Sequence, residues 1–168
     1  MEKKILILNK KQIEQKINRI AYQILEDTLD EKEIVIAGIA AHGYTIAKRL
    51  KSIIERISQT KALLINISMN KVSTHLDASL DVEVANCTGK TIILVDDVLN
   101  SGRTLAYGLG VFLNIPLKKI RTVVLVDRSH RIFPVSPDYT GLELATVLKE
   151  HVEVVLDEAN NEDAVYLS

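Results

Sequence analysis

Apolar residues fall along this chain in short continuous runs that are separated by longer amphipathic stretches. Four of the runs are rich in β-branched residues and cover positions 34–37, 63–67, 92–95 and 122–126. Apart from Asn66 and Thr122 they are apolar, and they do not alternate with polar residues, which is typical of strands covered on both faces. The pattern therefore predicts a mostly parallel sheet.

Two amphipathic stretches repeat their apolar positions every three or four residues, as an α-helix does. One stretch carries Ile13, Ile17, Ile20 and Ile24, and the other carries Ile46, Leu50, Ile53 and Ile57. Asn9 and Gln12 stand three residues apart before the first stretch, the spacing of a helix capping box. Strands that alternate with helices predict a doubly wound α/β fold around the parallel sheet.

Two further segments depart from these periods. Residues 70–81, which read NKVSTHLDASLD, are polar and show neither period, so we expect a mobile loop. Residues 151–156 and 164–167 are apolar runs on either side of a polar turn, which indicates a closing antiparallel pair. We therefore expect one domain over residues 1–168 that ends in a small C-terminal β element.

The composition narrows the range of partners. The 168 residues are 47% hydrophobic and 26% charged, with a formal net charge of -1, which is ordinary for a globular domain. This balance gives no overall attraction to nucleic acid or to an anionic membrane. Cys87 is the only cysteine, and the N-terminus has only four consecutive apolar residues. We therefore expect no disulfide, no signal peptide or membrane span, and a cytoplasmic location.

The clearest chemical signal follows the third apolar run, where the sequence reads DDVLNSGRT. In an open α/β sheet, ligands bind beyond the carboxyl ends of the strands. Ser101, Gly102 and Thr104 would offer backbone N–H groups and hydroxyls at the start of a helix, which suits a phosphate. Asp96 and Asp97 would repel a phosphate, but their carboxylates suit the hydroxyls of a ribose and a hydrated Mg²⁺. A ribose 5-phosphate satisfies both requirements.

A second turn of this kind follows the first apolar run and reads GIAAHGYT, from Gly38 to Thr45. Its spacing matches a P-loop, but Tyr44 stands where that motif requires lysine, which argues against a nucleoside triphosphatase. The backbone of the turn can still bind a second phosphate group. Either turn alone fits a capped helix start or ordinary turn chemistry equally well, whereas the two together favour phosphoribosyl pyrophosphate as the ligand.

The stretch IILVDDVLNSGRT, from Ile92 to Thr104, resembles the phosphoribosyl-pyrophosphate signature of the type I phosphoribosyltransferases. Two longer stretches extend the resemblance, GIAAHGYTIAKRL at 38–50 and VVLVDRSHRIFPVSPDYTG at 123–141. Together they are similar to the family that contains pyrimidine-operon attenuation regulators and uracil phosphoribosyltransferases. The resemblance covers nearly the whole chain and implies the type I phosphoribosyltransferase fold.

The resemblance implies a role for each part of the site. The ribose hydroxyls and Mg²⁺ would be held by Asp96 and Asp97. The 5-phosphate would be held by Asn100, Ser101, Gly102, Arg103 and Thr104, and the pyrophosphate by Ala40, Ala41, His42 and Gly43, in a loop that in such enzymes often contains a cis peptide. Lys71 and Arg103 are candidates for added positive charge during catalysis, and Asp127 and Arg128 for a wall of the nucleobase pocket.

The chain also departs from the family pattern. Ala41-His42-Gly43 stands where the family usually has Thr-Arg-Gly, Asn70-Lys71 where it has Tyr-Arg, and Leu142 where it tends to have lysine. A histidine is mostly neutral at pH 7, so the first change removes a fixed charge. These changes leave open how fast such an enzyme turns over and which nucleobase it takes.

Three functions are therefore considered. The first is a phosphoribosyltransferase, with uracil as the favoured base and a homodimer or larger homo-oligomer as the expected assembly. The second is an RNA-binding attenuation regulator that senses nucleotides, for which the sequence offers Lys10, Lys11, Lys16 and Arg19, interrupted by Glu14. The third is a pseudoenzyme that binds the ligand without turnover. RNA is possible but not favoured, because the interrupted cluster is typical of a solvated helix face.

Overall fold

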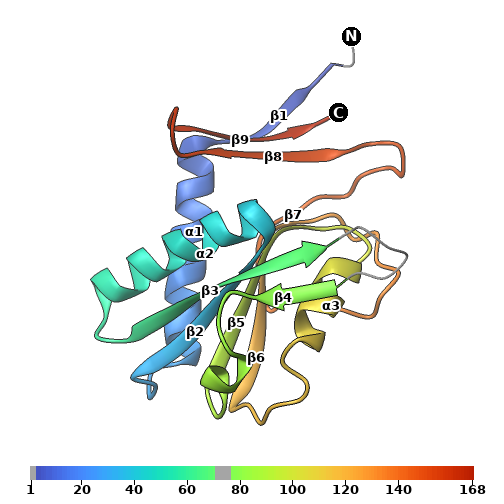
Figure 1. The fold of residues 1–168 in the computed structure, drawn as a ribbon. Helices are drawn as coiled ribbons and strands as arrows, with labels where there is room; N and C mark the ends of the chain where they lie inside the picture. Colours follow the sequence, from blue (N-terminus) through green and yellow to red (C-terminus); the bar gives the residue numbers. More distant parts are fainter. Residues whose placement is uncertain (1–2, 71–76) are drawn as a thin grey trace.

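The computed structural model describes residues 3–70 and 77–168, which form a central sheet, three α-helices and a small second sheet (Figure 1). The central sheet has the strand order β4-β3-β2-β5-β6-β7. Its strands are β2 (Glu33–Ile39), β3 (Lys61–Asn70), β4 (Asp77–Leu80), β5 (Thr91–Leu99), β6 (Lys119–Asp127) and β7 (Tyr139–Glu143). All neighbours are parallel except β3 and β4. The predicted doubly wound, mostly parallel sheet is confirmed.

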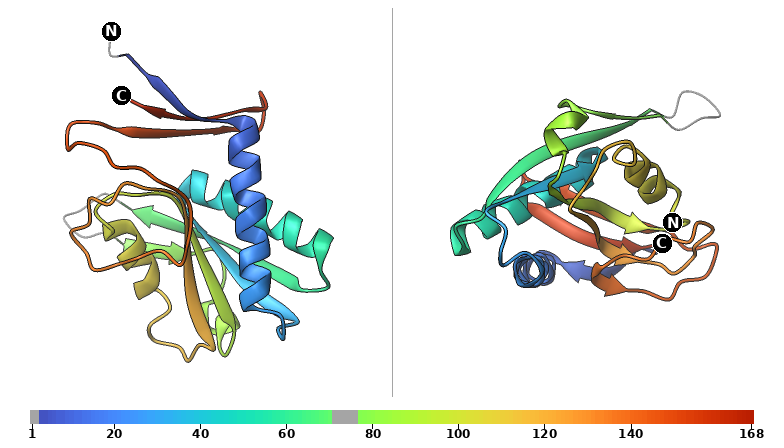
Figure 2. Two further views of the ribbon diagram at one scale, coloured as in Figure 1. Left: turned by 180° about the vertical axis from the view of Figure 1, so that it is seen from behind. Right: turned by 90° about the horizontal axis from the view of Figure 1, so that it is seen from below.

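Helices cover both faces of the central sheet (Figure 2). They are α1 (Lys10–Asp27), α2 (Ala40–Ile57) and α3 (Arg103–Gly110), with a short 3₁₀ helix, η1, at Val84–Cys87. In β2, Ile34 and Ile36 belong to the core that contains α1 and α2, while Val35 and Ala37 belong to the core that contains α3. Because both faces are buried, the inner strands β2, β3, β5 and β6 carry largely apolar runs, and these runs are why the sequence predicted them.

The first helix begins as its sequence indicates. The Asn9 side chain accepts a hydrogen bond from the Gln12 backbone N–H, and the Gln12 side chain accepts one from the Asn9 backbone N–H, both at 2.9 Å. Ile13, Ile17 and related positions on the same face are buried. The capping box thus fixes the start of α1 and turns its apolar face toward the sheet. No helix in the described ranges has both the length and the apolar character that crossing a lipid bilayer requires.

The expectation of a loop throughout 70–81 is wrong at both ends. Asn70 is the last residue of β3, and Asp77–Leu80 forms β4, which pairs antiparallel with it. A four-residue edge strand reading DASL has too little apolar or β-branched character to be predicted from its sequence, so only its pairing with β3 shows it. Residues 71–76 of that segment lie outside the described residues.

The predicted C-terminal pair forms part of a second sheet with strand order β1-β9-β8. Its strands are β1 (Ile5–Asn9), β8 (Val152–Asp157) and β9 (Glu162–Leu167), and both pairings are antiparallel. The antiparallel pair β8–β9 is confirmed, whereas β1 was not predicted. This small sheet lies beyond the carboxyl ends of β2 and β5, on the same side as the start of α2 (Figure 1).

Candidate functional site

The strand order brings the turns after β2 and β5 next to each other. These two strands are adjacent and parallel, with Gly38 opposite Val95. From β2 the chain continues to β3 on one side, and from β5 it continues to β6 on the other. Such a reversal of strand order is the usual ligand position of an open α/β sheet. Both turns that the sequence suggested for phosphate therefore start at this switch point.

Glycines allow the first turn to pack directly against the end of β5. A Cβ atom on Gly43 would lie 2.7 Å from the carbonyl oxygen of Val95 and 3.4 Å from Cα of Asp96. A Cβ atom on Gly38 would lie 2.4 Å from Cα of Tyr44. The approaches of 2.7 and 2.4 Å are closer than a Cβ atom permits. Gly43 therefore sets how near the first turn comes to the acidic residues, and Gly38 lets the turn fold closely onto itself.

The helix α2 starts directly in this turn. Ile39, at its N-cap, has no polar side chain to accept from the first backbone N–H groups of the helix, which include those of Ala41 and His42. Ala40 is exposed and has a left-handed backbone with φ of 55°. The cis peptide that the resemblance suggested for this loop is not found among the described residues. The turn offers backbone donors and a favourable dipole to an anion.

The second turn also leads into a helix, as predicted. Gly102 is the N-cap of α3, with φ of 84°, a left-handed conformation that favours glycine. The Ser101 hydroxyl accepts a hydrogen bond from the Arg103 backbone N–H at 3.2 Å. The Ser101 carbonyl accepts from the backbone N–H groups of Ile132 and Phe133 at 2.8 and 2.9 Å. The turn is therefore held both by a hydrogen bond within it and by two hydrogen bonds to the segment after β6.

The two acids lie in the last part of β5, which extends beyond the predicted run 92–95. Asp96 is 7% exposed and Asp97 is partly buried. Asp96 Oδ1 accepts from the Asp97 backbone N–H at 2.9 Å, and Asp97 Oδ1 accepts from the Val98 N–H at 2.8 Å. These bonds orient both carboxylates.

The donor set of the acids fits a Mg²⁺ ion held jointly with a substrate. Two carboxylates are hard oxygen donors of the kind that Mg²⁺ prefers. Within 3–70 and 77–168, the structure contains no group of three or more acidic, histidine or cysteine side chains placed to hold a metal. A cation here would therefore take its remaining ligands from phosphate oxygens and water, which is the usual way of binding Mg²⁺ in phosphate sites.

A third turn follows β6 and contains Asp127 and Arg128. The Asp127 side chain is 3% exposed; one carboxylate oxygen forms an ion pair with Arg131, and the other accepts from the Ser129 backbone N–H at 2.8 Å. Ser129 itself has a left-handed backbone with φ of 61°. Both oxygens of Asp127 thus stabilise the turn, one through an ion pair with Arg131 and the other through a backbone hydrogen bond.

Arg128 is buried and joins separate segments of the chain. Its Nη1 donates to Asn100 Oδ1 at 2.9 Å, its Nε donates to Thr146 Oγ1 at 3.1 Å, and its Nη2 donates to the carbonyl of Glu150. His130 Nε2 lies 2.6 Å from the Thr146 carbonyl oxygen. Thr146 and Glu150 were not predicted as partners of Arg128, because the stretch between β7 and β8 has no secondary-structure period.

The two candidates for added positive charge are Arg103 and Lys71. Arg103 is exposed at the start of α3, and its guanidinium carbon lies 5.7 Å from the centre of the Tyr107 ring. Lys71, like His75, lies outside the described residues. The structure therefore places Arg103 beside the second turn and does not test Lys71.

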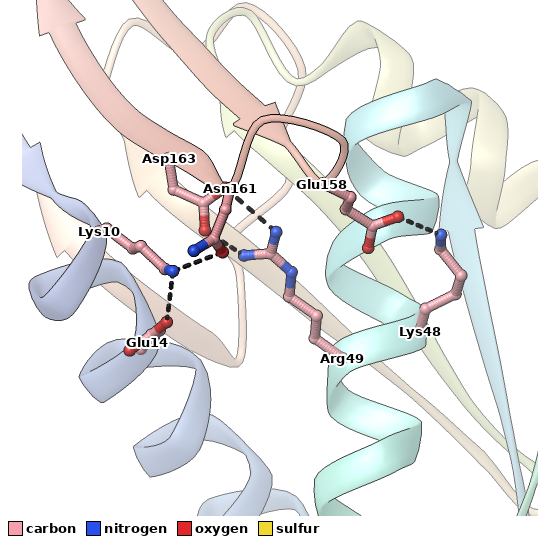
Figure 3. Close-up of polar contacts among 7 residues, drawn as sticks. All are labelled: Lys10, Glu14, Lys48, Arg49, Glu158, Asn161 and Asp163. Atoms are coloured by element: carbon pink, nitrogen blue, oxygen red, sulfur yellow. Dashed lines mark hydrogen bonds and ion pairs between the residues drawn. The ribbon is translucent and has the colours of Figure 1, made fainter.

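The small sheet is fixed to α2 by charged side chains (Figure 3). Arg49 makes two hydrogen bonds to the Asp163 carboxylate, at 2.6 and 3.1 Å, and the Asp163 side chain is only 3% exposed. Lys48 pairs with Glu158 at 2.8 Å. Lys10, on α1, reaches Asn161 in the β8–β9 turn (Figure 3). The helix that begins in the first phosphate turn is thus held against β9.

Comparison with known proteins decides the family. The model of the phosphoribosyl transferase domain matches residues 6–159. This chain belongs to the phosphoribosyltransferase family. It is 36% identical over 176 residues to a protein named "Bifunctional protein PyrR" from Clostridium novyi, covering 98% of this chain and 97% of that one. A protein of the same name from Microcystis aeruginosa is 34% identical over 171 residues, covering 97% and 96%. The resemblance to the PyrR-like phosphoribosyltransferases is confirmed.

Solved structures of phosphoribosyltransferases share the fold. A hypoxanthine phosphoribosyl transferase from Trypanosoma cruzi superposes with a TM-score of 0.77 at 16% identity, covering 96% of this chain and 90% of that chain. A hypoxanthine-guanine phosphoribosyltransferase from Bacillus anthracis gives a TM-score of 0.72 at 23% identity, covering 83% of each chain. At these identities the likeness establishes the type I phosphoribosyltransferase fold and leaves the nucleobase open.

Proposed function

We propose that this phosphoribosyltransferase moves ribose 5-phosphate from phosphoribosyl pyrophosphate to a nucleobase, with uracil as the base, and releases pyrophosphate. The observation that carries the proposal is the meeting of two glycine-containing, helix-starting turns beside an acidic strand end. One turn suits each phosphate end of the substrate, and the acids suit the sugar between them. Uracil is favoured by the resemblance to the PyrR-like family.

The reaction needs positioning more than covalent catalysis. Displacement of pyrophosphate by a base nitrogen passes through an oxocarbenium-like state, so the protein must align the reactants and stabilise charge on the leaving group. Asp96 and Asp97 would orient the ribose hydroxyls. The 5-phosphate would bind to the turn from Asn100 to Thr104, and the pyrophosphate to the turn from Ala40 to Gly43, including Ala41 and His42.

Three further elements complete the proposed site. Mg²⁺ bound with the substrate would neutralise negative charge on the pyrophosphate. Lys71 and Arg103 would add positive charge near the leaving group. Asp127 and Arg128 would form one wall of the nucleobase pocket, by holding the turn after β6 in place rather than by offering unpaired groups to the base.

Replacing Asp97 with Asn tests the sugar assignment. Loss of a charged hydrogen bond costs about 1.5–3 kcal/mol, so affinity for phosphoribosyl pyrophosphate with Mg²⁺ should fall by about tenfold or more. The thermal midpoint should change little, because Asp97 is only partly buried. Asp30→Asn, an exposed acid in the turn after α1, is the matched control and should bind normally. Isothermal titration beside a thermal melt measures both quantities, and unchanged affinity in Asp97→Asn would refute the assignment.

A panel of nucleobases with phosphoribosyl pyrophosphate and Mg²⁺ tests the reaction itself. Formation of uridine monophosphate and pyrophosphate from uracil supports the proposal. Turnover with a purine base instead would correct the base and keep the reaction class. Tight ligand binding without turnover of any base would establish the pseudoenzyme.

An RNA-binding regulator is the second candidate, since the relatives share the name "Bifunctional protein PyrR". The basic face of α1 is partly occupied: Arg19 donates to the carbonyls of Thr140 and Gly141, and Lys10 contacts Glu14. Fewer cations are therefore available for phosphate contacts than the sequence suggests. Filter binding over a salt series should show weak affinity at physiological ionic strength, and a tight, sequence-selective complex would place the regulator first.

A further inference from the structure

Arg128 is the one buried cation, among the described residues of the site, that touches a phosphate turn. It is 6% exposed, and each of its three guanidinium nitrogens donates a hydrogen bond. One bond goes to Asn100, the first residue after β5, and the other two go to Thr146 and Glu150 before β8. The planar, rigid fork of arginine suits this arrangement in a way that lysine does not.

The contact with Arg128 determines which way the Asn100 amide faces. A guanidinium has only donors, so Asn100 must present its oxygen to it. Its NH₂ group then points away from Arg128. Asn100 is exposed, and its NH₂ group makes no hydrogen bond within 3–70 and 77–168. The second turn therefore offers a side-chain donor, the Asn100 NH₂ group, whose direction is set by the hydrogen bond from Arg128.

We infer that Arg128 is a positioning residue that acts through Asn100. By holding Oδ1, it directs the two N–H bonds of Asn100 toward an oxygen of the phosphoribosyl group bound at the turn. The inference rests on the proposed function, because it requires that group as the ligand. In this role Arg128 does not itself touch the substrate, and it does more than hold the turn after β6 in place.

Aspartate at position 100 separates the donor from the link to Arg128. Asn100→Asp keeps an oxygen for Arg128 but replaces the NH₂ donor with a second oxygen. Affinity for phosphoribosyl pyrophosphate should fall by about tenfold or more, since the lost bond to a charged oxygen is replaced by repulsion. The thermal midpoint should stay the same or rise, because a carboxylate pairs well with the buried guanidinium.

Arg128→Lys tests the positioning role directly. An ammonium cannot reach all three partners, so affinity for phosphoribosyl pyrophosphate should fall in this variant, as it does in Asn100→Asp. If Arg128 acts through Asn100, the double variant should bind no worse than Asn100→Asp alone. If the two residues acted independently, the loss of affinity in the double variant would equal the product of the two single losses to within about twofold. Thr146→Val, which removes a different partner of Arg128, is the control: it should lower the thermal midpoint and leave affinity unchanged.

A spectroscopic measurement keeps the test decisive if Arg128→Lys fails to fold. In ¹⁵N-labelled wild-type protein, the side-chain amide signals that disappear in Asn100→Asp should shift when phosphoribosyl pyrophosphate and Mg²⁺ are added. Signals that do not move, normal affinity in Asn100→Asp, or multiplying effects in the double variant would each overturn the inference alone. If the wild-type protein does not bind phosphoribosyl pyrophosphate, the proposed function falls first and the inference with it.

Discussion

Gly43→Ala perturbs the contact on which the proposed site depends most. The added Cβ would lie 2.7 Å from the Val95 carbonyl oxygen, and ordinary contact begins near 3.4 Å. The first turn of α2 must therefore move away from β5 by about 0.7 Å, because the atom it meets belongs to the backbone of a central strand. The turn from Ala40 to Gly43 would withdraw from Asp96.

The size of the effect follows from two opposing terms. Overpacking of this kind costs about 1–3 kcal/mol, while alanine gains about 1 kcal/mol over glycine inside a helix. We expect a net destabilisation of about 1 kcal/mol, which lowers the thermal midpoint of a domain of this size by about 2–4 °C. Pyrophosphate binding should suffer more, by about 10- to 100-fold, because misplacement near 1 Å has effects of that order.

The assay compares Gly43→Ala with Gly110→Ala by thermal melting and by titration with pyrophosphate and Mg²⁺. Gly110 ends α3, and a Cβ there would meet no atom within 4 Å, so this variant should keep or slightly raise its thermal midpoint and keep its affinity. A loss of affinity larger than the loss of stability in Gly43→Ala supports the site. Wild-type affinity in that variant would refute the reasoning, because the turn would then not carry the pyrophosphate.

Two further predictions concern stability. Asp163→Asn should reduce the free energy of unfolding in urea by about 1–3 kcal/mol, which is below the usual cost of breaking a buried pair because the Arg49 side chain is 23% exposed. Glu158→Gln, in the exposed pair with Lys48, should cost under about 1 kcal/mol. Equal effects of the two substitutions would show that burial of Asp163 is unimportant. Burial, and then the hydrogen bond to Asp27, raise the pKa of the Tyr139 hydroxyl. Since the folded state holds this proton more tightly, the stabilisation is fully present below the ordinary tyrosine pKa of about 10 and is lost as the pH rises above it. Urea midpoints at about pH 9 and pH 11 should therefore fall less steeply in Tyr139→Phe than in the wild type, and parallel slopes would contradict the assignment.

The parts of the fold that were predicted are those whose own residues carry the signal. Central strands such as β2 and β5 are buried on both faces, so their apolar runs are continuous. The two helix-starting turns are marked by glycine, at position 102 for a left-handed backbone and at position 43 for close approach to Val95. That these turns bind phosphate stays a prediction.

The missed elements are edge strands whose cause is distant. β1 pairs with β9, from the opposite end of the chain, and β7 reads YTGLE, in which polar residues and a glycine hide the strand. β7 lies at an edge, where only one side is paired, so no apolar run is required. The partners of Arg128 were missed for the same reason, since Thr146 and Glu150 are brought to it by the path of the chain after β7.

The residues that the sequence left unexplained support the two phosphate turns from behind. The first turn opens α2, and α2 is held to β9 by Arg49 and Asp163 (Figure 3). The second turn includes Asn100, which Arg128 links to the segment that leads into β8. Both strands belong to the small sheet, so the C-terminal third of the chain braces each turn through a buried or half-buried arginine. The small sheet therefore contributes to the spacing between the two turns that we propose bind phosphate, although it carries neither of them.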